Sequence, residues 1–370
     1  MEIRCLKQEL LEKVHIASRA ISTKSVLPIL SGIKITAAKT ISLIATDLEM
    51  SIITQVNGDI VETGETVAPA RLLVDILKSL PGAAVVVKVM PEQGSVNITC
   101  QNAEFDIRVL SPADFPELPQ ITGARTVALK LSTFSHLARQ VVRAASTDEA
   151  RAVLTGILLH FQDKKIKMVA TDSYRLAVSQ ANIDSEVSEE EVIVPAKAIT
   201  EVSRMQPREN PKDSEPLLRV AFASNQMRFD MNGHTVITRL ISGKYPPYQQ
   251  LIPSGYTTVI ELPPTQLEET VRRIATLAQN NTPVRFFFTP NRLIISASTR
   301  EVGQAREEVP IQYSGEDREI AFNPTFFLDG LASIKEEIVE FKMDSALKPG
   351  LLKPRGDDNF LYLIMPVRTG

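Results

Sequence analysis

Apolar and polar positions alternate along the chain with two different periods, which predicts both helices and strands. From Leu6 to Ile21 the apolar residues recur every three or four positions, the spacing of one face of a helix. Around Val96 and Ile98 the period drops to two, as expected of a strand with one buried face. Another alternating stretch ends at Asn232 and Gly233, residue types that tolerate the positive φ angles of a tight hairpin turn. The pattern therefore predicts helices combined with antiparallel strands.

Three elements recur in the same order along the chain, which indicates an internal triplication. An apolar stretch ending in Thr-Asp returns 125 residues later, with a weaker third copy; the copies are Ile41–Asp47, Ile166–Asp172 and Leu293–Thr299. A helix that begins near a proline follows each copy, at Pro69, Pro195 and Pro324. The helical stretches that open the repeats are Leu6–Ile21, Leu131–Ser146 and Leu262–Gln279.

These recurrences place three repeats at residues 1–124, 125–255 and 256–370. Each is predicted to hold two helices and six to eight antiparallel strands, with the helices on one face of the sheet, so the expected fold class is α+β. Proline-bearing connectors, Ser111–Pro119 and Ser242–Pro253, close the first two repeats. Two polar stretches, Asp184–Glu191 and Gln206–Pro216, are expected to be solvated loops.

Composition is that of an ordinary globular chain: 370 residues, 44% hydrophobic and 23% charged. It excludes a largely disordered or fibrous protein, and no apolar run is long enough for a membrane span. The charged start has no apolar signal core, so we expect a cytoplasmic protein without a membrane partner. The two cysteines, Cys5 and Cys100, are too far apart for a metal or redox motif.

Catalytic motifs are absent from the sequence. It contains no phosphate-binding loop, dinucleotide fingerprint, nucleophile elbow or zinc-protease motif, and its four histidines are scattered. The Thr-Asp pairs are the one candidate carboxylate site, and an acid such as Glu49 could help to hold a metal there. Because each pair lies between two apolar strands, an aspartate that closes a turn with its own backbone is the preferred interpretation. We therefore expect no enzyme, no catalytic residue, no metal and no cofactor.

Charge is distributed unevenly, although the net charge is only −3. The repeats carry 11 basic and 14 acidic, 17 and 14, and 13 and 16 residues, and several predicted helices are locally basic. A basic helix layer in an acidic protein suggests a surface that faces a polyanion. On charge alone, a solvated helix face balanced by nearby acids is the simpler alternative.

Four motifs follow one another along the chain: Leu27–Leu30, Ala45–Met50, Ala170–Ala177 and Tyr362–Arg368. Together they resemble the bacterial DNA polymerase III beta subunit, the sliding clamp of replication, and the likeness extends over essentially the whole chain. The resemblance implies the DNA-clamp fold: a ring-forming homodimer of six similar units, assembled head to tail, with helices lining the hole and sheets forming the rim. Duplex DNA would pass through the hole.

The function implied is that of a DNA polymerase processivity factor. Such a ring slides without sequence specificity, which requires diffuse attraction to phosphate rather than contacts to base edges. The implied partners are the replicative DNA polymerase catalytic subunit, an ATP-dependent clamp loader, and repair and translesion proteins that carry a short clamp-binding motif. The alternative is a clamp-fold scaffold that recruits partners without encircling DNA.

Site residues follow from the resemblance together with the charge pattern. The residues expected to face DNA are Arg19, Lys24, Arg71, Lys78, Arg139, Arg143, Lys197 and Arg204. The partner-peptide pocket is expected at Leu154, Thr171, Arg175, Leu176, Pro246, Leu251, Ile364, Met365, Pro366, Val367 and Arg368. We expect apolar walls, a methionine floor and arginines at a wetter rim. At the dimer interface, Phe105 and Ile107 are expected near Leu277 of the other chain.

Three positions depart from the family pattern. Tyr174 stands where a histidine is common, Val153 where an aromatic residue is common, and Gln250 where an arginine is common. These differences bear on the peptide preference and on part of the DNA contact.

Overall fold

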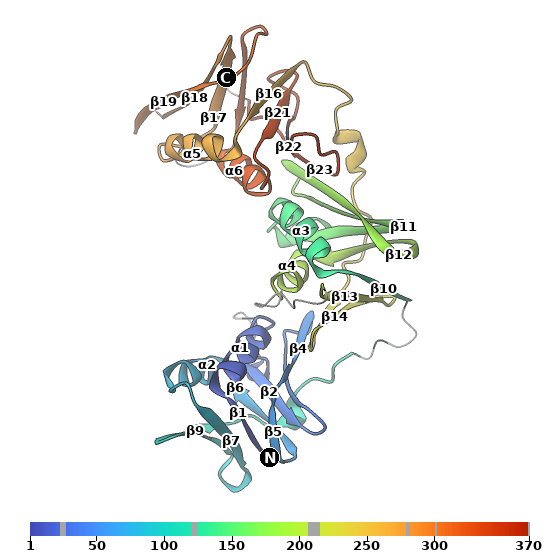
Figure 1. Cartoon of the computed structure of the whole chain (residues 1–370), viewed down its shortest axis with the longest axis vertical. Coiled ribbons are helices and arrows are strands. Elements are labelled where there is room, and N and C mark those ends of the chain that lie inside the picture. Colours follow the sequence, from blue (N-terminus) through green and yellow to red (C-terminus); the bar gives the residue numbers. More distant parts are fainter. Residues whose placement is uncertain are drawn as a thin grey trace. The chain divides into compact units, whose positions relative to one another are not determined.

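The computed structural model describes residues 1–22, 27–119, 121, 125–205, 215–278, 282–299 and 302–368. This part of the chain divides into two compact units. The first unit combines residues 1–132 with 204–240, and the second combines 133–203 with 241–370. Figure 1 labels the main helices and strands.

Two antiparallel sheets form the first unit. One sheet has the strand order β5 (Gly58–Glu62), β1 (Glu2–Leu6), β7 (Ala84–Met90), β8 (Ser95–Cys100), β9 (Ala103–Arg108). The other has the order β10 (Arg125–Lys130), β13 (Leu217–Phe222), β14 (Gln226–Met231), β15 (His234–Arg239), β4 (Met50–Val56), β3 (Ile41–Thr46), β2 (Gly32–Ala37), β6 (Gly64–Pro69). The pairing of β15 with β4 joins the first two repeats in one continuous sheet.

Helices α1 (Lys7–Ser18) and α2 (Ala70–Ser79) lie side by side against these strands (Figure 1). The predicted apolar stripe of α1 is buried at Leu10 and Val14, and burying a side chain of this size contributes about 1.5–3 kcal/mol. Helix α2 begins directly after Pro69, as predicted. Short 3-10 turns are η1 (Pro28–Ser31), η2 (Pro91–Gln93) and η3 (Pro112–Asp114).

Two further antiparallel sheets form the second unit. The six-stranded sheet has the order β11 (Gly156–Thr171), β12 (Arg175–Pro195), β23 (Phe360–Ile364), β22 (Gly350–Pro354), β21 (Val339–Met343), β16 (Thr258–Leu262). The four-stranded sheet has the order β19 (Gly303–Pro310), β18 (Arg292–Thr299), β17 (Val284–Thr289), β20 (Arg318–Phe322). Because β12 pairs with β23, the second and third repeats also share a sheet.

The helices that lie largely in the second unit are α3 (Leu131–Val141), α4 (Ala196–Arg204), α5 (Pro264–Ala275) and α6 (Pro324–Ala332). The short turns are η4 (Val142–Ala144), η5 (Glu149–Thr155) and η6 (Tyr248–Leu251). An aromatic cluster holds α6 against the sheets: the Phe286 and Phe327 rings lie 4.5 Å apart, with Phe322 and Phe341 packed around them. This cluster is the core of the third repeat.

The observed fold confirms the α+β class, and the turn at Asn232 and Gly233 has the positive φ angles, 41° and 78°, that its sequence predicts. The expected strand number is wrong for the first repeat, where the described residues form nine strands, β1 to β9. The stretch Asp184–Glu191 is solvated but is part of β12, not a loop. Its backbone pairs with β11 although neither face is fully buried, so no apolar alternation marks it as a strand. Of Gln206–Pro216, residues 206–214 lie outside the described residues.

Candidate functional site

The Thr-Asp pair at the end of β11 closes the turn into β12. The Oδ1 atom of Asp172 accepts hydrogen bonds from the backbone N–H groups of Tyr174 and Arg175, both at 2.9 Å. The Thr171 hydroxyl donates to the Arg175 carbonyl at 2.6 Å. These bonds confirm that the aspartate closes a turn, and they place Arg175 opposite Ile364 of β23.

The side chain of Arg175 is largely enclosed by protein, so its expected position at a wetter rim is wrong. Its side chain is 10% exposed, and its Nε donates to Asp172 at 3.0 Å. Its Nη1 lies 2.5 Å from Asp329 Oδ2 and 3.2 Å from the Tyr362 hydroxyl. The guanidinium also lies 4.5 Å from the centre of the Phe326 ring. Arg175 therefore joins the second and third repeats, because β23 and α6 supply partners that no local motif reveals.

Two backbone hydrogen bonds hold the segment Met365–Val367 of the C-terminal tail. Met365 N–H donates to the Tyr174 carbonyl and Val367 N–H donates to the Ala321 carbonyl, each at 2.8 Å. This leaves the Met365 side chain 41% exposed, whereas Ile364 is buried in β23. The tail therefore offers Met365 to solvent beside the turn that Asp172 closes.

Connector residues complete this region. The Tyr245 hydroxyl accepts a hydrogen bond from Thr171 N–H at 3.1 Å, and burial raises the pKa of Tyr245, which keeps the hydroxyl neutral. Leu176, Leu363 and Tyr248 are buried in the same apolar cluster. On the exposed side of the connector are Pro246 and Leu251.

The structure thus brings the predicted pocket residues together in one compact unit, but with two different roles. The buried residues, which lie behind the exposed ones, are Leu154, Thr171, Leu176 and Ile364. The residues at least partly open to solvent are Pro246, Leu251, Met365, Pro366, Val367 and Arg368. A cavity of about 570 Å³ adjoins the tail at Val367 and Arg368.

Sequence reasoning missed part of this wall. The cavity beside the tail is also lined by Glu319, Ile320, Ala321, Ala346 and Leu347. Tyr174, identified only as a departure from the family pattern, is 59% exposed and stacks on Phe326 of α6, with ring centres 6.2 Å apart. No sequence signal links these positions, since each becomes a neighbour only through the pairing of distant strands.

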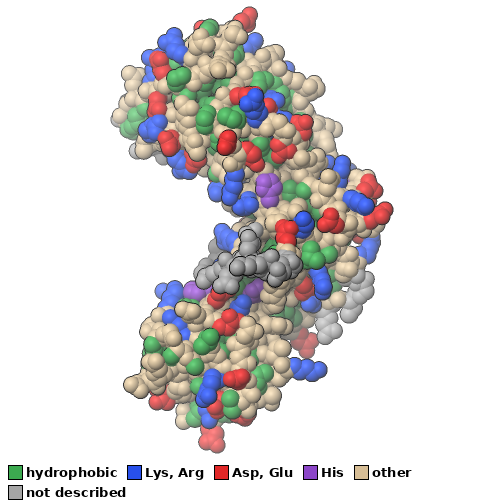
Figure 2. Space-filling view, viewed as in Figure 1, with side chains coloured by type: hydrophobic (Ala, Val, Ile, Leu, Met, Phe, Trp, Pro, Cys, Tyr) green, Lys and Arg blue, Asp and Glu red, His purple; other side chains and the backbone are tan. Residues whose placement is uncertain are grey.

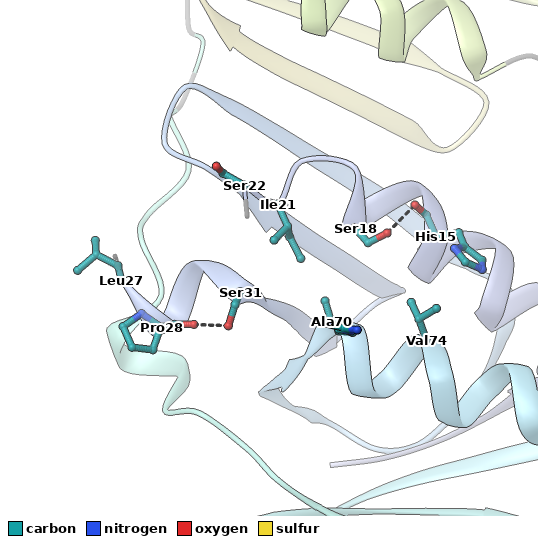
Figure 3. A pocket seen from close by; sticks show the side chains of 10 residues that line it. His15, Ser18, Ile21, Ser22, Leu27, Pro28, Ser31, Ala70 and Val74 are labelled. Carbon is teal, nitrogen blue, oxygen red and sulfur yellow. Dashed lines mark hydrogen bonds between the residues drawn. The ribbon is translucent and has the colours of Figure 1, made fainter. Parts of the chain in front are cut away.

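On the helices of the first unit, the predicted DNA-facing residues Arg19, Arg71 and Lys78 are exposed. His15 of α1 lies near two of them: burial lowers its pKa, and the positive charges of Lys78 and Arg19 lower it further. Figure 3 shows His15 and Ser18 of α1 near Ala70 and Val74 of α2, around a pocket that Arg71 also lines. Lys24 lies outside the described residues.

In the second repeat, Arg139, Arg143, Lys197 and Arg204 are likewise exposed on or beside helices. Arg139 Nε donates to the Ser135 carbonyl of its own helix at 3.2 Å. Arg143 differs, because its Nη1 lies 3.2 Å from Asp329 Oδ1, which offsets part of its charge. Figure 2 shows basic and acidic side chains interspersed on the face that it views, so the positive charge is local rather than a broad field.

The predicted dimer residues lie at places that differ in exposure. Phe105 and Ile107 belong to β9, the edge strand of its sheet, and Leu277 follows α5. Phe105 and Leu277 are half-buried, whereas Ile107 is only 5% exposed within its own sheet.

Comparison with protein families gives three matches that follow one another along the chain. Residues 1–119 match the N-terminal domain of the DNA polymerase III beta subunit, 128–247 its central domain and 249–368 its C-terminal domain. The chain belongs to the DNA polymerase III beta subunit family. The three-domain DNA-clamp fold and the class of function expected from the resemblance, a polymerase processivity factor without a catalytic site, are thereby confirmed.

Relatives and solved structures agree with this assignment along their whole length. The chain is 34% identical to a beta sliding clamp of Staphylococcus epidermidis and 33% identical to one of Staphylococcus aureus, over 100% of each protein. A DNA polymerase sliding clamp from Bacillus subtilis superposes with a TM-score of 0.91 at 30% identity, over 100% of both chains. A sliding clamp from Pseudomonas aeruginosa bound to griselimycin gives 0.91 at 27% identity, again over 100% of both chains. Among the described residues, no helix is long and apolar enough to cross a membrane.

Proposed function

We propose that two copies of this chain close a ring around duplex DNA and tether the replicative DNA polymerase catalytic subunit to its template. Family membership supports the ring, because the relatives and the solved structures it matches over their full length are sliding clamps. One observation supports the tethering role: hydrogen bonds join the turn at Asp172 to the connector at Tyr245 and to the tail at Met365. Thr171 N–H binds the Tyr245 hydroxyl and Met365 N–H binds the Tyr174 carbonyl, which leaves Met365 open beside a rigid frame.

The pocket takes a short peptide with apolar anchors. The exposed side chains of Met365, Leu251 and Leu347 offer apolar contact, and buried central anchors dominate the affinity of such peptides. Repair and translesion proteins that carry the same kind of motif compete with the polymerase for this pocket. Arg175, whose side chain is only 10% exposed, fixes the geometry of the wall through Phe326 and Asp329.

DNA is held by the exposed helix cations. Arg71, Lys78 and Arg139 have no ion-pair partner in the described part of the chain, so they are available to phosphate. Such contacts are weak, independent of sequence and sensitive to salt, as sliding requires. Arg19, Lys24, Arg143, Lys197 and Arg204 belong to the same proposed surface.

The dimer closes head to tail through β9 and its neighbours. Strands β9 and β19 are edges of their sheets, and an edge strand offers backbone groups for pairing with another chain. Phe105 of one chain, backed by the buried Ile107, meets Leu277 of the other, and two chains close the contact with two-fold symmetry. The repeats at residues 1–124, 125–255 and 256–370 are the six units of this ring. Because the sequence has no phosphate-binding loop, a separate ATP-dependent clamp loader opens the ring, in the cytoplasm.

Solution mass and primer extension test the proposal together. The chain should sediment at twice its 40.8 kDa mass, and Phe105→Asp should shift it to the monomer. With a clamp loader and the polymerase, it should lengthen the products made on a long primed template, and the monomeric variant should not. A scaffold that recruits partners without encircling DNA would leave product length unchanged.

A further inference from the structure

The junction between the first two repeats reproduces the turn and tail bonds of the peptide pocket's frame. The bond to the Tyr245 hydroxyl has no counterpart, because Phe115 stands at that place. The Oδ1 atom of Asp47 accepts from the N–H groups of Glu49 at 3.1 Å and Met50 at 2.7 Å, as Asp172 does in the next repeat. The Thr46 hydroxyl donates to the Met50 carbonyl at 3.1 Å. Arg239 N–H donates to the Glu49 carbonyl at 2.9 Å, in the way that Met365 binds Tyr174.

Strand register extends the equivalence to individual side chains. Strand β4 pairs with β15 as β12 pairs with β23; the corresponding pairs are Met50–Thr238 and Ser51–Ile237 in the first junction, and Arg175–Ile364 and Leu176–Leu363 in the second. The connectors agree as well. Phe115 is buried and precedes Pro116, as buried Tyr245 precedes Pro246.

A cavity lies against this turn and connector in the first unit. It measures about 160 Å³, and its lining includes Leu48, Glu49, Glu117, Leu118, Thr238 and Arg239. All of the lining residues belong to one compact unit and to described parts of the chain. The position is therefore a second pocket with the frame of the first.

The lining chemistry has changed from apolar to charged. Arg239 stands where the tail has Met365, and Glu49 stands where the next repeat has Tyr174. Both side chains are exposed, and neither has an ion-pair partner among the described residues. In the second junction, an apolar anchor of a bound peptide would lie over Met365. A ligand side chain at the same place in the first junction would meet the guanidinium of Arg239, which binds a carboxylate in a planar geometry with two hydrogen bonds.

We infer that this pocket binds a short extended peptide of a partner protein, with an Asp or Glu anchor on Arg239 flanked by a basic residue facing Glu49 and Glu117. Leu48, Pro116 and Leu118 supply a small apolar contact beside these charges. With a volume of about 160 Å³, the cavity suits one anchor side chain. The two pockets then recruit partners of different charge without competing.

The test is an NMR titration of the full chain, without DNA or loader, followed at the Ile237 and Leu48 methyl groups. The probe is the blocked peptide Gly-Lys-Asp-Leu-Gly, with Gly-Gln-Asn-Leu-Gly as its uncharged match. We expect a saturable chemical-shift change in the wild type. The peptide affinity should fall at least tenfold in Arg239→Glu and much less in Arg239→Lys. The peptide with Lys in place of Asp should bind Arg239→Glu better than it binds the wild type.

A Met365→Ala variant separates this pocket from the proposed function. It should leave the titration unchanged, because Met365 belongs to the other compact unit. No saturable shift at millimolar peptide, equal binding of the uncharged peptide, or loss of the shift in Met365→Ala would each overturn the inference. The readout needs no ring, so failure of the proposed ring would leave this result standing.

Discussion

Asp329 and Arg175 are joined by a 2.5 Å ion pair between the third and second repeats. The other carboxylate oxygen of Asp329 lies 3.2 Å from Arg143, one of the predicted DNA-facing residues. A single carboxylate on α6 therefore holds one arginine in the wall of the proposed peptide pocket and partly neutralises another beside the helices.

Replacing Asp329 by Asn should lower stability and weaken peptide binding together. Arg175 would keep Asp172 and Tyr362 but lose its closest charged partner while remaining buried, which costs about 2 kcal/mol. The midpoint of urea unfolding and the peptide dissociation constant measure the two effects. Asp317→Asn, at an exposed position in the same unit, is the matched control. An unchanged peptide affinity in Asp329→Asn would show that the ion pair of Arg175 with Asp329 does not affect peptide binding.

Met365→Ala should affect binding more than folding. The side chain is partly exposed, so its truncation should cost about 1 kcal/mol of stability. As a central contact of a short peptide, it should cost ~2 kcal/mol or more of binding, roughly thirtyfold in affinity. The measurement is titration of a labelled peptide with a Gln followed by spaced Leu and Phe anchors. Val259→Ala, at an exposed apolar position of β16 in the same unit, should bind normally. Equal affinity of Met365→Ala and the wild type would show that Met365 is not part of the proposed pocket.

The triple variant Arg139→Glu, Arg143→Glu, Lys197→Glu should load slowly and bind DNA with a flatter salt dependence, while remaining dimeric. Each lost phosphate contact reduces the slope of log affinity against log salt by about 0.9. Arg143 should contribute the least, since Asp329 already pairs with it. The matched control reverses Lys164 and Lys165, which are exposed on the β11–β12 hairpin instead of on helices. Normal loading and an unchanged slope in the triple variant would exclude these helices as the DNA face.

His234 should make the first unit sensitive to acid. Burial, and to a lesser degree Lys13, lower the pKa of His234 to about 4, whereas an unfolded histidine titrates near 6.5. Between these values only the unfolded chain takes up the proton, so stability is complete above about pH 6.5 and is lost as the pH falls toward 4. The loss is at most about 1.4 kcal/mol per pH unit.

Urea unfolding at a series of pH values measures this effect in the wild type and in His234→Gln, which cannot titrate. The difference between the two curves should grow below pH 6.5. His136→Gln, at an exposed position, is the control. Parallel curves for wild type and His234→Gln would show that His234 is not the group responsible.

Local signals account for what the sequence predicts correctly. Thr-Asp turns and the proline at the start of α2 act through bonds between near neighbours, so the positions of Thr171, Asp172 and Pro69 follow from their own segments. The recurrence of these signals also predicts the triplication. The prediction of a loop at the acidic end of β12 is wrong, because this segment becomes a strand only by pairing with β11 and carries no apolar alternation of its own.

Tertiary pairing accounts for what the sequence does not reveal. Arg175 and Tyr362 are 187 positions apart, and only the pairing of β12 with β23 makes them neighbours. Burial of Arg175 and the roles of Phe326 and Asp329 follow from that pairing. The sequence predicts an exposed arginine, but the guanidinium of Arg175 instead contacts carboxylates and an aromatic ring.

Retention on circular and linear DNA tests the central claim, a ring held on DNA by topology, most directly. The chain would be loaded on a nicked circular plasmid, separated from free protein by gel filtration, and followed after a single cut. The account predicts retention on the circle and release after linearisation, while a phosphate-contact protein would be retained equally on both. Equal retention, or release from the intact circle as fast as from the linear form, would contradict it.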